Sequence, residues 1–198
     1  MFYEPKNGHG LPHDPFKAIV APRPIGWIST RAANRQVNLA PYSFFNAVGG
    51  NPPLVMFSSE GAKDSVSFAE ETGEFVANLV SYDLLDAMNK TSAGLPRGQS
   101  EFEVAGLTAV DSQLVQAPRV AEAVASLECK VTKAMPLEDI EGKPTGAIMI
   151  IGQVVCVHIA EHALKDGKFD TAGAKLCSRL GYMDYATVEN TFTLKRPS

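Results

Sequence analysis

Cysteine is scarce in this chain of 198 residues, which has three, Cys129, Cys156 and Cys177. An odd number with no Cys-x-x-Cys pair excludes both a disulfide framework and a zinc ribbon. We interpret all three as small apolar side chains of a protein core. Free thiols are typical of a reduced compartment, so the sequence predicts a cytoplasmic protein.

Long apolar runs and an excess of positive charge are also missing. The longest apolar run, residues 147–151, is far shorter than the roughly 20 residues of a membrane-spanning helix. Residues 1–15 carry prolines and polar groups where a signal peptide needs an apolar stretch. Lys and Arg number 18 against 22 Asp and Glu, so little charge is available to neutralise a phosphate backbone. From these absences we predict that the protein binds neither a membrane nor nucleic acid.

Motifs for nucleotide binding and metal binding fail on their context. Gly8-x-Gly10 lies in a proline-rich segment with no strand before it, so it is not a dinucleotide-binding turn. His158, Glu161 and His162 match the H-x-x-E-H pattern of some zinc enzymes. They directly continue a predicted strand, where positions four apart lie about 13 Å apart. We therefore predict no metal site, and we assign no catalytic residue.

Turn-forming residues are frequent, with 16 glycines and 13 prolines, and they divide the chain into short elements. Residues 1–15 are predicted to form an irregular arm, and the whole chain, residues 1–198, a single domain. Patterns of β-branched and apolar residues predict strands over 25–30, 37–40, 54–59, 75–80, 126–131 and 148–159. Helices are predicted from 64 or 65 to 73 and from 83 to 93.

Strands outnumber helices, and the helices are too few to cross over between parallel strands. The sequence therefore predicts a mainly β fold, an antiparallel barrel with peripheral helices. Residues 95–121 are expected to form a long excursion with at most short elements, and long loops of this kind often cover sites.

Polar groups suited to an anion occur at two points. Ser29 and Thr30 place hydroxyl groups at the end of a predicted strand. Lys63 precedes the start of a predicted helix, where unpaired backbone N–H groups attract negative charge. Asp64 or Ser65 is expected to cap that helix. Together these residues could bind one phosphate group.

Between those two points, residues 41–46 have the pattern of neither a helix nor a clean strand. The segment mixes the rings of Tyr42, Phe44 and Phe45 with the polar groups of Ser43 and Asn46. Such a mixture suits a flat heteroaromatic ring that is both flanked and hydrogen-bonded. Taken singly, each residue is equally explained as a strand end, a helix cap or core. The combination predicts a phosphorylated planar cofactor.

These segments resemble the flavin reductase-like proteins of the FMN-binding split-barrel fold. The family pattern R-P-x-x-W-[IV]-S-T corresponds to residues 23–30, and N-L-A-P-[YF]-S-[FY]-F-N to residues 38–46. A Pro-Pro pair at 52–53 and Lys-Asp-Ser at 63–65 extend the resemblance, and the later segments 73–80 and 179–182 also resemble family segments. The resemblance implies an antiparallel split β-barrel and a homodimer, with FMN bound near the interface of the dimer.

The resemblance also implies a set of cofactor-binding residues. Residues 29–30 and 63–65 are expected near the phosphate, and residues 43–46 near the flavin ring or the ribityl chain. The set is Trp27, Ser29, Thr30, Ser43, Phe44, Phe45, Asn46, Lys63, Asp64 and Ser65. A carboxylate facing a phosphate is unfavourable, so Asp64 is expected to contribute its backbone N–H or to pair with a basic side chain.

The implied activity is that of an oxidoreductase. It would transfer a hydride from NADH or NADPH to N5 of the flavin, and pass electrons to free flavin or to a partner monooxygenase. Two alternatives remain open. One is a non-enzymatic FMN electron carrier of the flavoredoxin type, and the other is a binding module that kept the barrel and lost the flavin.

Overall fold

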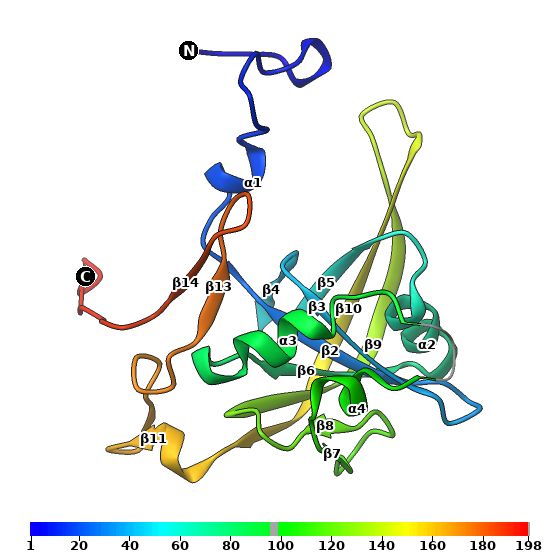
Figure 1. Cartoon of the computed structure of the whole chain (residues 1–198), viewed down its shortest axis with the longest axis vertical. Helices are drawn as coiled ribbons and strands as arrows, with labels where there is room; N and C mark the ends of the chain where they lie inside the picture. Colours follow the sequence, from blue (N-terminus) through cyan, green and yellow to red (C-terminus); the bar gives the residue numbers. More distant parts are fainter. Residues whose placement is uncertain (96–98, 198) are drawn as a thin grey trace.

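The computed structural model describes residues 1–95 and 99–197. Within these residues the main sheet has seven strands in the order β3-β2-β6-β9-β10-β5-β4, and each neighbouring pair is antiparallel (Figure 1). The strands are β2 (Gly26–Arg31), β3 (Val37–Tyr42), β4 (Phe45–Gly50), β5 (Pro53–Glu60), β6 (Glu74–Leu79), β9 (Ala125–Glu138) and β10 (Pro144–Ile159).

Smaller elements surround this sheet. A three-stranded sheet consists of β1 (Arg23–Pro24), β13 (Cys177–Arg179) and β14 (Tyr185–Thr187). Two short strand pairs are formed by β7 (Ala109–Val110) with β8 (Arg119–Val120) and by β11 (Leu164–Lys165) with β12 (Lys168–Phe169). The helices are α1 (Phe16–Ile19), α2 (Asp64–Thr72), α3 (Leu85–Lys90) and α4 (Glu101–Ala105), with the 3-10 turns η1 (Pro5–Asn7), η2 (Tyr82–Leu84) and η3 (Glu161–Ala163).

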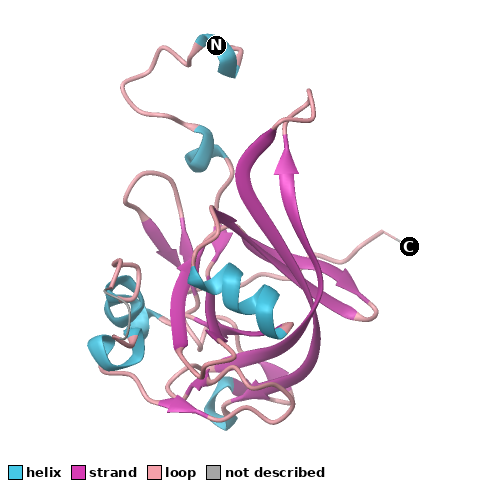
Figure 2. Ribbon diagram, turned by 90° about the vertical axis from the view of Figure 1, so that its right-hand side faces the viewer, coloured by secondary structure: helices cyan, strands magenta, loops and turns pink. Residues whose placement is uncertain are grey.

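The main sheet curls around an aromatic core. Tyr42 of the edge strand β3 packs against Phe57 of β5, with ring centroids 5.0 Å apart, although four strands separate β3 from β5 in the sheet. Phe57 in turn meets Phe75 of β6 edge to face at 5.3 Å. These contacts require a strongly bent sheet, and Figure 2 shows the bend in its long strands. The predicted split barrel is confirmed.

Helix α2 packs against the strands of the curled sheet. It contacts β2, β3, β6, β9 and β10, and Val66 and Ala69 are buried in the same core as the three rings. Burying each large apolar side chain of such a core contributes about 1.5–3 kcal/mol. The helix ends at Gly73, which adopts the left-handed conformation with φ 72°, as the sequence predicted.

The start of α2 differs from the prediction. Lys63, rather than Asp64 or Ser65, is the N-cap residue, and among the described residues no side chain forms a capping hydrogen bond. Lys63 has extended backbone angles and cannot reach back with an acceptor, because its side chain carries only donors. The first backbone N–H groups of the helix therefore remain available to another acceptor.

Two other segments differ in extent from the prediction. The helix expected over 83–93 consists of η2 and α3 and ends at Lys90, where Thr91 turns its hydroxyl back to donate to the carbonyl of Met88. Residues 41–46 are mostly strand: β3 runs to Tyr42 and β4 begins at Phe45, because both rings enter the core.

The segment 95–121 has the short elements that were expected. Its described part contains α4, β7 and β8, while residues 96–98 lie outside the described residues. At the N-terminal end, residues 1–15 form the single turn η1 and project away from the main sheet (Figure 1). Among the described residues no helix is both long enough and apolar enough to cross a membrane.

Gly152 of β10 marks the tightest contact of the core. A Cβ atom at this position would lie 2.4 Å from Cε1 of Phe75 and 3.0 Å from Cβ of Cys129. We expect Gly152→Ala to displace the ring of Phe75 and to lower the free energy of unfolding by about 1–3 kcal/mol, the usual cost of overpacking. Urea denaturation followed by circular dichroism measures this loss.

Gly50→Ala is the matched control, since a Cβ atom on this β4 residue would meet no atom within 4 Å. Equal unfolding free energies for Gly152→Ala and Gly50→Ala would contradict the packing described here.

Candidate functional site

A cleft of about 580 Å³ lies between the edge strand β3, the start of α2 and the segment that follows α3. This volume is within the range of sites for small molecules and cofactors. The lining residues are Asn38, Ala40, Pro41, Tyr42, Lys63, Asp64, Ser65, Thr91, Ser92, Ala93, Gly94, Leu95 and Glu101. The structure therefore brings the predicted residues Lys63, Asp64 and Ser65 together at one end of a cleft.

A side pocket of about 240 Å³ adjoins the cleft, and the two share Pro41 and Ser92. The predicted residue Ser43 lines this pocket, opposite residues from α3 and from the C-terminal sheet. Arg179 contributes a cation there, with its guanidinium carbon 4.4 Å from the centroid of the Tyr185 ring. Cleft and side pocket are thus neighbours, and each has a cationic side chain in its lining, Lys63 in the cleft and Arg179 in the side pocket.

The cleft is suited to an anion at the start of α2. The nine-residue helix begins there without a side-chain cap, and its first N–H groups carry the positive end of the helix dipole. The ammonium group of Lys63 adds a full positive charge at the same place. An uncapped helix start beside a lysine is a favourable site for a phosphate group.

Polar side chains surround this helix start. Asn38 donates from Nδ2 to Oγ of Ser65 across 2.7 Å, which connects β3 to α2. Thr30 lies opposite Asn38 in the pairing of β2 with β3 and is fully buried. Its hydroxyl has no hydrogen-bond partner among the described residues. A buried hydroxyl without a partner costs about 1–3 kcal/mol. Thr30 lies beneath the cleft and lines neither the cleft nor the side pocket.

Two carboxylates and a phenol shape the electrostatics of the cleft. Burial raises the pKa of Glu101, and the nearby carboxylate of Asp64 raises it further. The backbone N–H of Leu39, which donates to Glu101 at 3.3 Å, partly opposes this rise in pKa. Burial likewise raises the pKa of the Tyr42 phenol. The phenol therefore keeps its proton at neutral pH and can donate a hydrogen bond within the cleft.

Besides Thr30, three predicted residues lie in the protein interior instead of lining the site. Trp27 is fully buried, and its indole Nε1–H donates to Oγ1 of Thr91 at 2.8 Å. The Ser29 hydroxyl is fully buried and donates to the carbonyl of Pro118. Phe45 packs in the core. Trp27 thus supports the cleft through Thr91 rather than lining it, because alternate residues of a strand face opposite sides.

The other two predicted residues lie outside both cavities. Phe44 is half-buried, and Nζ of Lys17 lies 5.6 Å from the centroid of its ring. Asn46 is exposed, and its Oδ1 accepts the N–H of Ala47 at 2.8 Å. In the described residues of this single chain, these two side chains do not line the cleft or the side pocket.

The sequence reasoning missed several residues of the site. Thr91, Ser92 and Glu101 follow α3, and no local motif marks them. Two signals were present: the expectation that residues 95–121 cover a site applies to Glu101, and the resemblance of residues 179–182 to a family segment applies to Arg179. The side pocket residues Arg179 and Tyr185 lie far from the cleft in sequence and reach it only through the pairing of β1 with β13 and of β13 with β14.

Glu101 should make the stability of the protein depend on pH. Its pKa is higher in the folded chain than in the unfolded chain, so just above the ordinary glutamate value of about 4.3 the folded chain binds more protons. The free energy of unfolding then falls as the pH rises through this range. We expect Glu101→Gln to remove this decline, so that its stability relative to the wild type increases with pH.

Urea unfolding at several values between about pH 4 and pH 7 measures the effect. Glu103→Gln is the control, because Glu103 lies exposed on the same helix, α4. Parallel pH profiles for the wild type and Glu101→Gln would contradict the raised pKa.

Comparisons with known proteins find extensive similarity. The sequence profile described as "Flavin reductase like domain" matches residues 20–184. An uncharacterized protein of Halalkalibacterium halodurans is 39% identical over 184 residues, which cover 90% of this chain and 88% of that protein. The crystal structure of nitrilotriacetate monooxygenase component B from Bacillus cereus superposes with a TM-score of 0.87 at 35% identity, over 98% of each chain.

Flavoredoxin of Desulfovibrio vulgaris (Miyazaki F) superposes with a TM-score of 0.77, over 89% of this chain and 91% of that chain. Its sequence identity is 21%, so this similarity shows a common fold alone.

Proposed function

We propose that this chain, which belongs to the flavin reductase like domain family, binds FMN in the cleft with the phosphate at the start of α2. The observation that carries the proposal is the uncapped start of α2, which lies beside Lys63 and opens into the cleft. Lys63 supplies the counter-charge, and the first N–H groups of α2 supply donors.

The carboxylates of Asp64 and Glu101 restrict how an anion can bind. Either carboxylate would repel a phosphate group at close range. Asp64 is therefore expected to contact the phosphate through its backbone N–H.

The side pocket is the proposed place of the flavin ring. It shares Pro41 and Ser92 with the cleft, and its lining includes the aromatic residue Tyr185 and the polar residues Ser43 and Asn89. A planar heteroaromatic ring requires this combination of stacking and hydrogen-bonding groups. The chain would thereby fix the position of the ring, and the walls of the pocket would limit contact with water.

The proposed activity is that of an NAD(P)H-dependent oxidoreductase in a reduced, cytoplasmic setting. When bound, the flavin supplies the redox chemistry, accepting a hydride at N5 and passing electrons to an acceptor. No general acid or base of the chain is required, and the Tyr42 phenol stays protonated. The acceptor is free flavin or a partner oxygenase. The similarity to a structure described as component B of a monooxygenase supports the oxygenase.

An electron carrier without nucleotide activity is the second candidate. It remains open, because the same residues of the cleft would hold FMN in an enzyme or in a carrier. The two candidates differ in their electron donor, which is a nicotinamide nucleotide for the enzyme and a protein for the carrier.

The FMN site is further proposed to lie near the interface of a homodimer. Apolar side chains on the N-terminal part of the chain support this, because Phe2 is 93% exposed and Ile19 is 71% exposed in the single chain. A second copy could cover these side chains and complete the outer side of the site, where Phe44 and Asn46 lie outside both cavities.

Anaerobic mixing of the FMN-loaded protein with NADH or NADPH in a stopped-flow instrument tests the enzyme against the carrier. We expect at least one nucleotide to bleach the flavin absorbance faster than it reduces free FMN in the same buffer, since a positioned donor and acceptor react faster. If neither nucleotide reduces the bound flavin faster than it reduces free FMN, the proposed enzymatic activity is contradicted. It would favour the carrier if a reduced electron-transfer protein bleaches the flavin. Failure to bind FMN at all would favour a binding module that has lost its flavin.

Lys63→Gln tests the phosphate assignment. Losing the charge-assisted contact is expected to weaken FMN binding by about 1–3 kcal/mol while leaving riboflavin binding nearly unchanged, because riboflavin has no phosphate. Fluorescence titration with both flavins measures the two affinities. Lys143→Gln is the control, since it removes the same charge from the exposed β9–β10 turn. Equal losses for FMN and riboflavin would contradict a phosphate at Lys63.

A further inference from the structure

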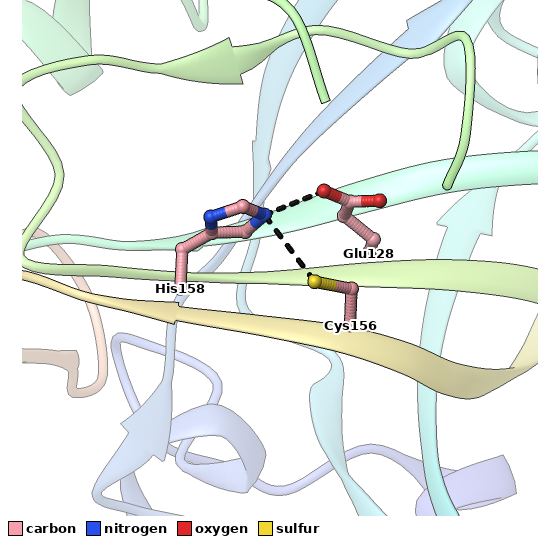
Figure 3. Close-up of side chains that lie close together, drawn as sticks. All are labelled: Glu128, Cys156 and His158. Atoms are coloured by element: carbon pink, nitrogen blue, oxygen red, sulfur yellow. Dashed lines mark hydrogen bonds and ion pairs between the residues drawn. The ribbon is translucent and has the colours of Figure 1, made fainter. Parts of the chain in front are cut away.

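Glu128, Cys156 and His158, here called the Glu128 cluster, lie together on β9 and β10. Cys156 lies directly opposite Glu128 in the strand pairing, and His158 follows two residues later on the same face of β10. Nε2 of His158 lies 2.5 Å from Oε1 of Glu128 and 3.6 Å from Sγ of Cys156. Figure 3 shows the ring nitrogen facing both the carboxylate and the sulfur.

The carboxylate of Glu128 is held rigidly at the base of this cluster. It has no exposed surface, and its oxygens accept the backbone N–H groups of Gln113 and Leu114, each at 2.7 Å. His158 is 22% exposed and Cys156 is half-buried, so solvent reaches the cluster from their side. The cleft and the side pocket, as described, include none of the three residues.

Two features separate the cluster from an ordinary buried ion pair. The interpretation of Cys156 as a core residue is wrong, because its thiol is half-buried beside two polar groups. A proton relay between thiol and carboxylate would use both ring nitrogens of His158, one toward each group. Here one nitrogen, Nε2, faces both, so the three donor atoms converge on a common point and lie within 4.8 Å of one another.

Convergence of sulfur, nitrogen and oxygen atoms is the geometry of a metal site. Zinc bonds of about 2.0–2.3 Å in a tetrahedron place neighbouring ligand atoms about 3.3–3.6 Å apart. The distance from Nε2 of His158 to Sγ of Cys156 already has this length. The distance from Nε2 to Oε1 of Glu128 would have to lengthen by about 0.8 Å, which a small rotation of the partly exposed ring provides.

We propose that the Glu128 cluster binds one Zn²⁺ ion through Glu128, Cys156 and His158, with water as the fourth ligand on the exposed side. The thiol of Cys156 loses its proton to solvent on binding, and the resulting thiolate and carboxylate neutralise the two positive charges. A sulfur and an imidazole ligand select Zn²⁺ over Mg²⁺, which prefers six oxygen ligands. The ion would connect β9 to β10 and, through Glu128, to residues 113–114.

The histidine pair of the H-x-x-E-H pattern does not form this site. His162 lies exposed in η3, after β10 has ended, and does not belong to the cluster. His162 is therefore a natural control for its neighbour His158. Because the cluster is separate from the cleft, the proposed metal site does not depend on the proposed flavin site.

Equilibrium dialysis of the purified full-length protein, first freed of metal with a chelator, tests the proposal with Zn²⁺ and Mg²⁺ in parallel. We expect one Zn²⁺ per chain by elemental analysis after dialysis, and no Mg²⁺ above background. Cys156→Ser and His158→Asn should each weaken Zn²⁺ binding at least about tenfold. Losing a residue that only orients a metal ligand already weakens binding by about this factor, and losing a ligand should cost no less. His162→Asn and Cys177→Ser should bind Zn²⁺ as the wild type does.

Alkylation of the native protein gives a second measurement. Cys129 and Cys177 are buried, and burial raises the pKa of both thiols, so alkylation reports on Cys156. We expect Zn²⁺, but not Mg²⁺, to protect Cys156. Circular dichroism verifies that each variant is folded. Absence of Zn²⁺ binding, wild-type affinity in Cys156→Ser and His158→Asn, or loss of binding in His162→Asn would each overturn the proposal.

Discussion

The close approach of aromatic rings to the backbone of the curled sheet is the constraint on which the rest of this structure depends. A Cβ atom at Gly152 would lie 2.4 Å from the ring of Phe75, and one at Gly26 would lie 2.5 Å from the ring of Phe45. Without side chains at these points, rings fill the space inside the sheet, and Tyr42 can meet Phe57 across it. Interiors packed at this density tolerate little added volume.

The curl gives the main sheet two faces with different partners. On the inner side, α2 packs against the core and starts beside β3, so that the cleft forms where the edge strand, the helix start and the segment after α3 meet. An open flat sheet would leave these elements apart. The proposed flavin site is thus a consequence of closure, because its lining residues come from separate segments of the chain.

On the outer side, buried polar groups attach the segment that contains β7 and β8 to the sheet. Asn78 of β6 donates to the carbonyl of Trp27, and its Oδ1 accepts the N–H of Val120 and the hydroxyl of Ser126. Glu128 binds the N–H groups of Gln113 and Leu114 of the same segment. Buried polar groups with partners of this kind specify where a loop lies, since leaving any of them unpaired is costly. The Glu128 cluster belongs to this second set of contacts.

The sequence by itself determined the elements and one end of the site. Patterns of β-branched and apolar residues predicted every strand of the main sheet except β4, and Gly73 predicted where α2 ends. Residues 63–65 were placed correctly at the start of a helix, because these features depend on neighbours in the chain. The family motifs extended this to the fold, and the split barrel was confirmed.

Tertiary structure alone decided which way side chains face and which distant residues meet. Trp27 and Ser29 face the interior rather than the cleft, and the motif that contains them gives no sign of this. Glu101 joins the cleft from beyond α3, and Glu128 meets His158 across thirty residues of sequence. Strand register and sheet curvature set these contacts, and both result from packing of the whole core rather than from any local pattern.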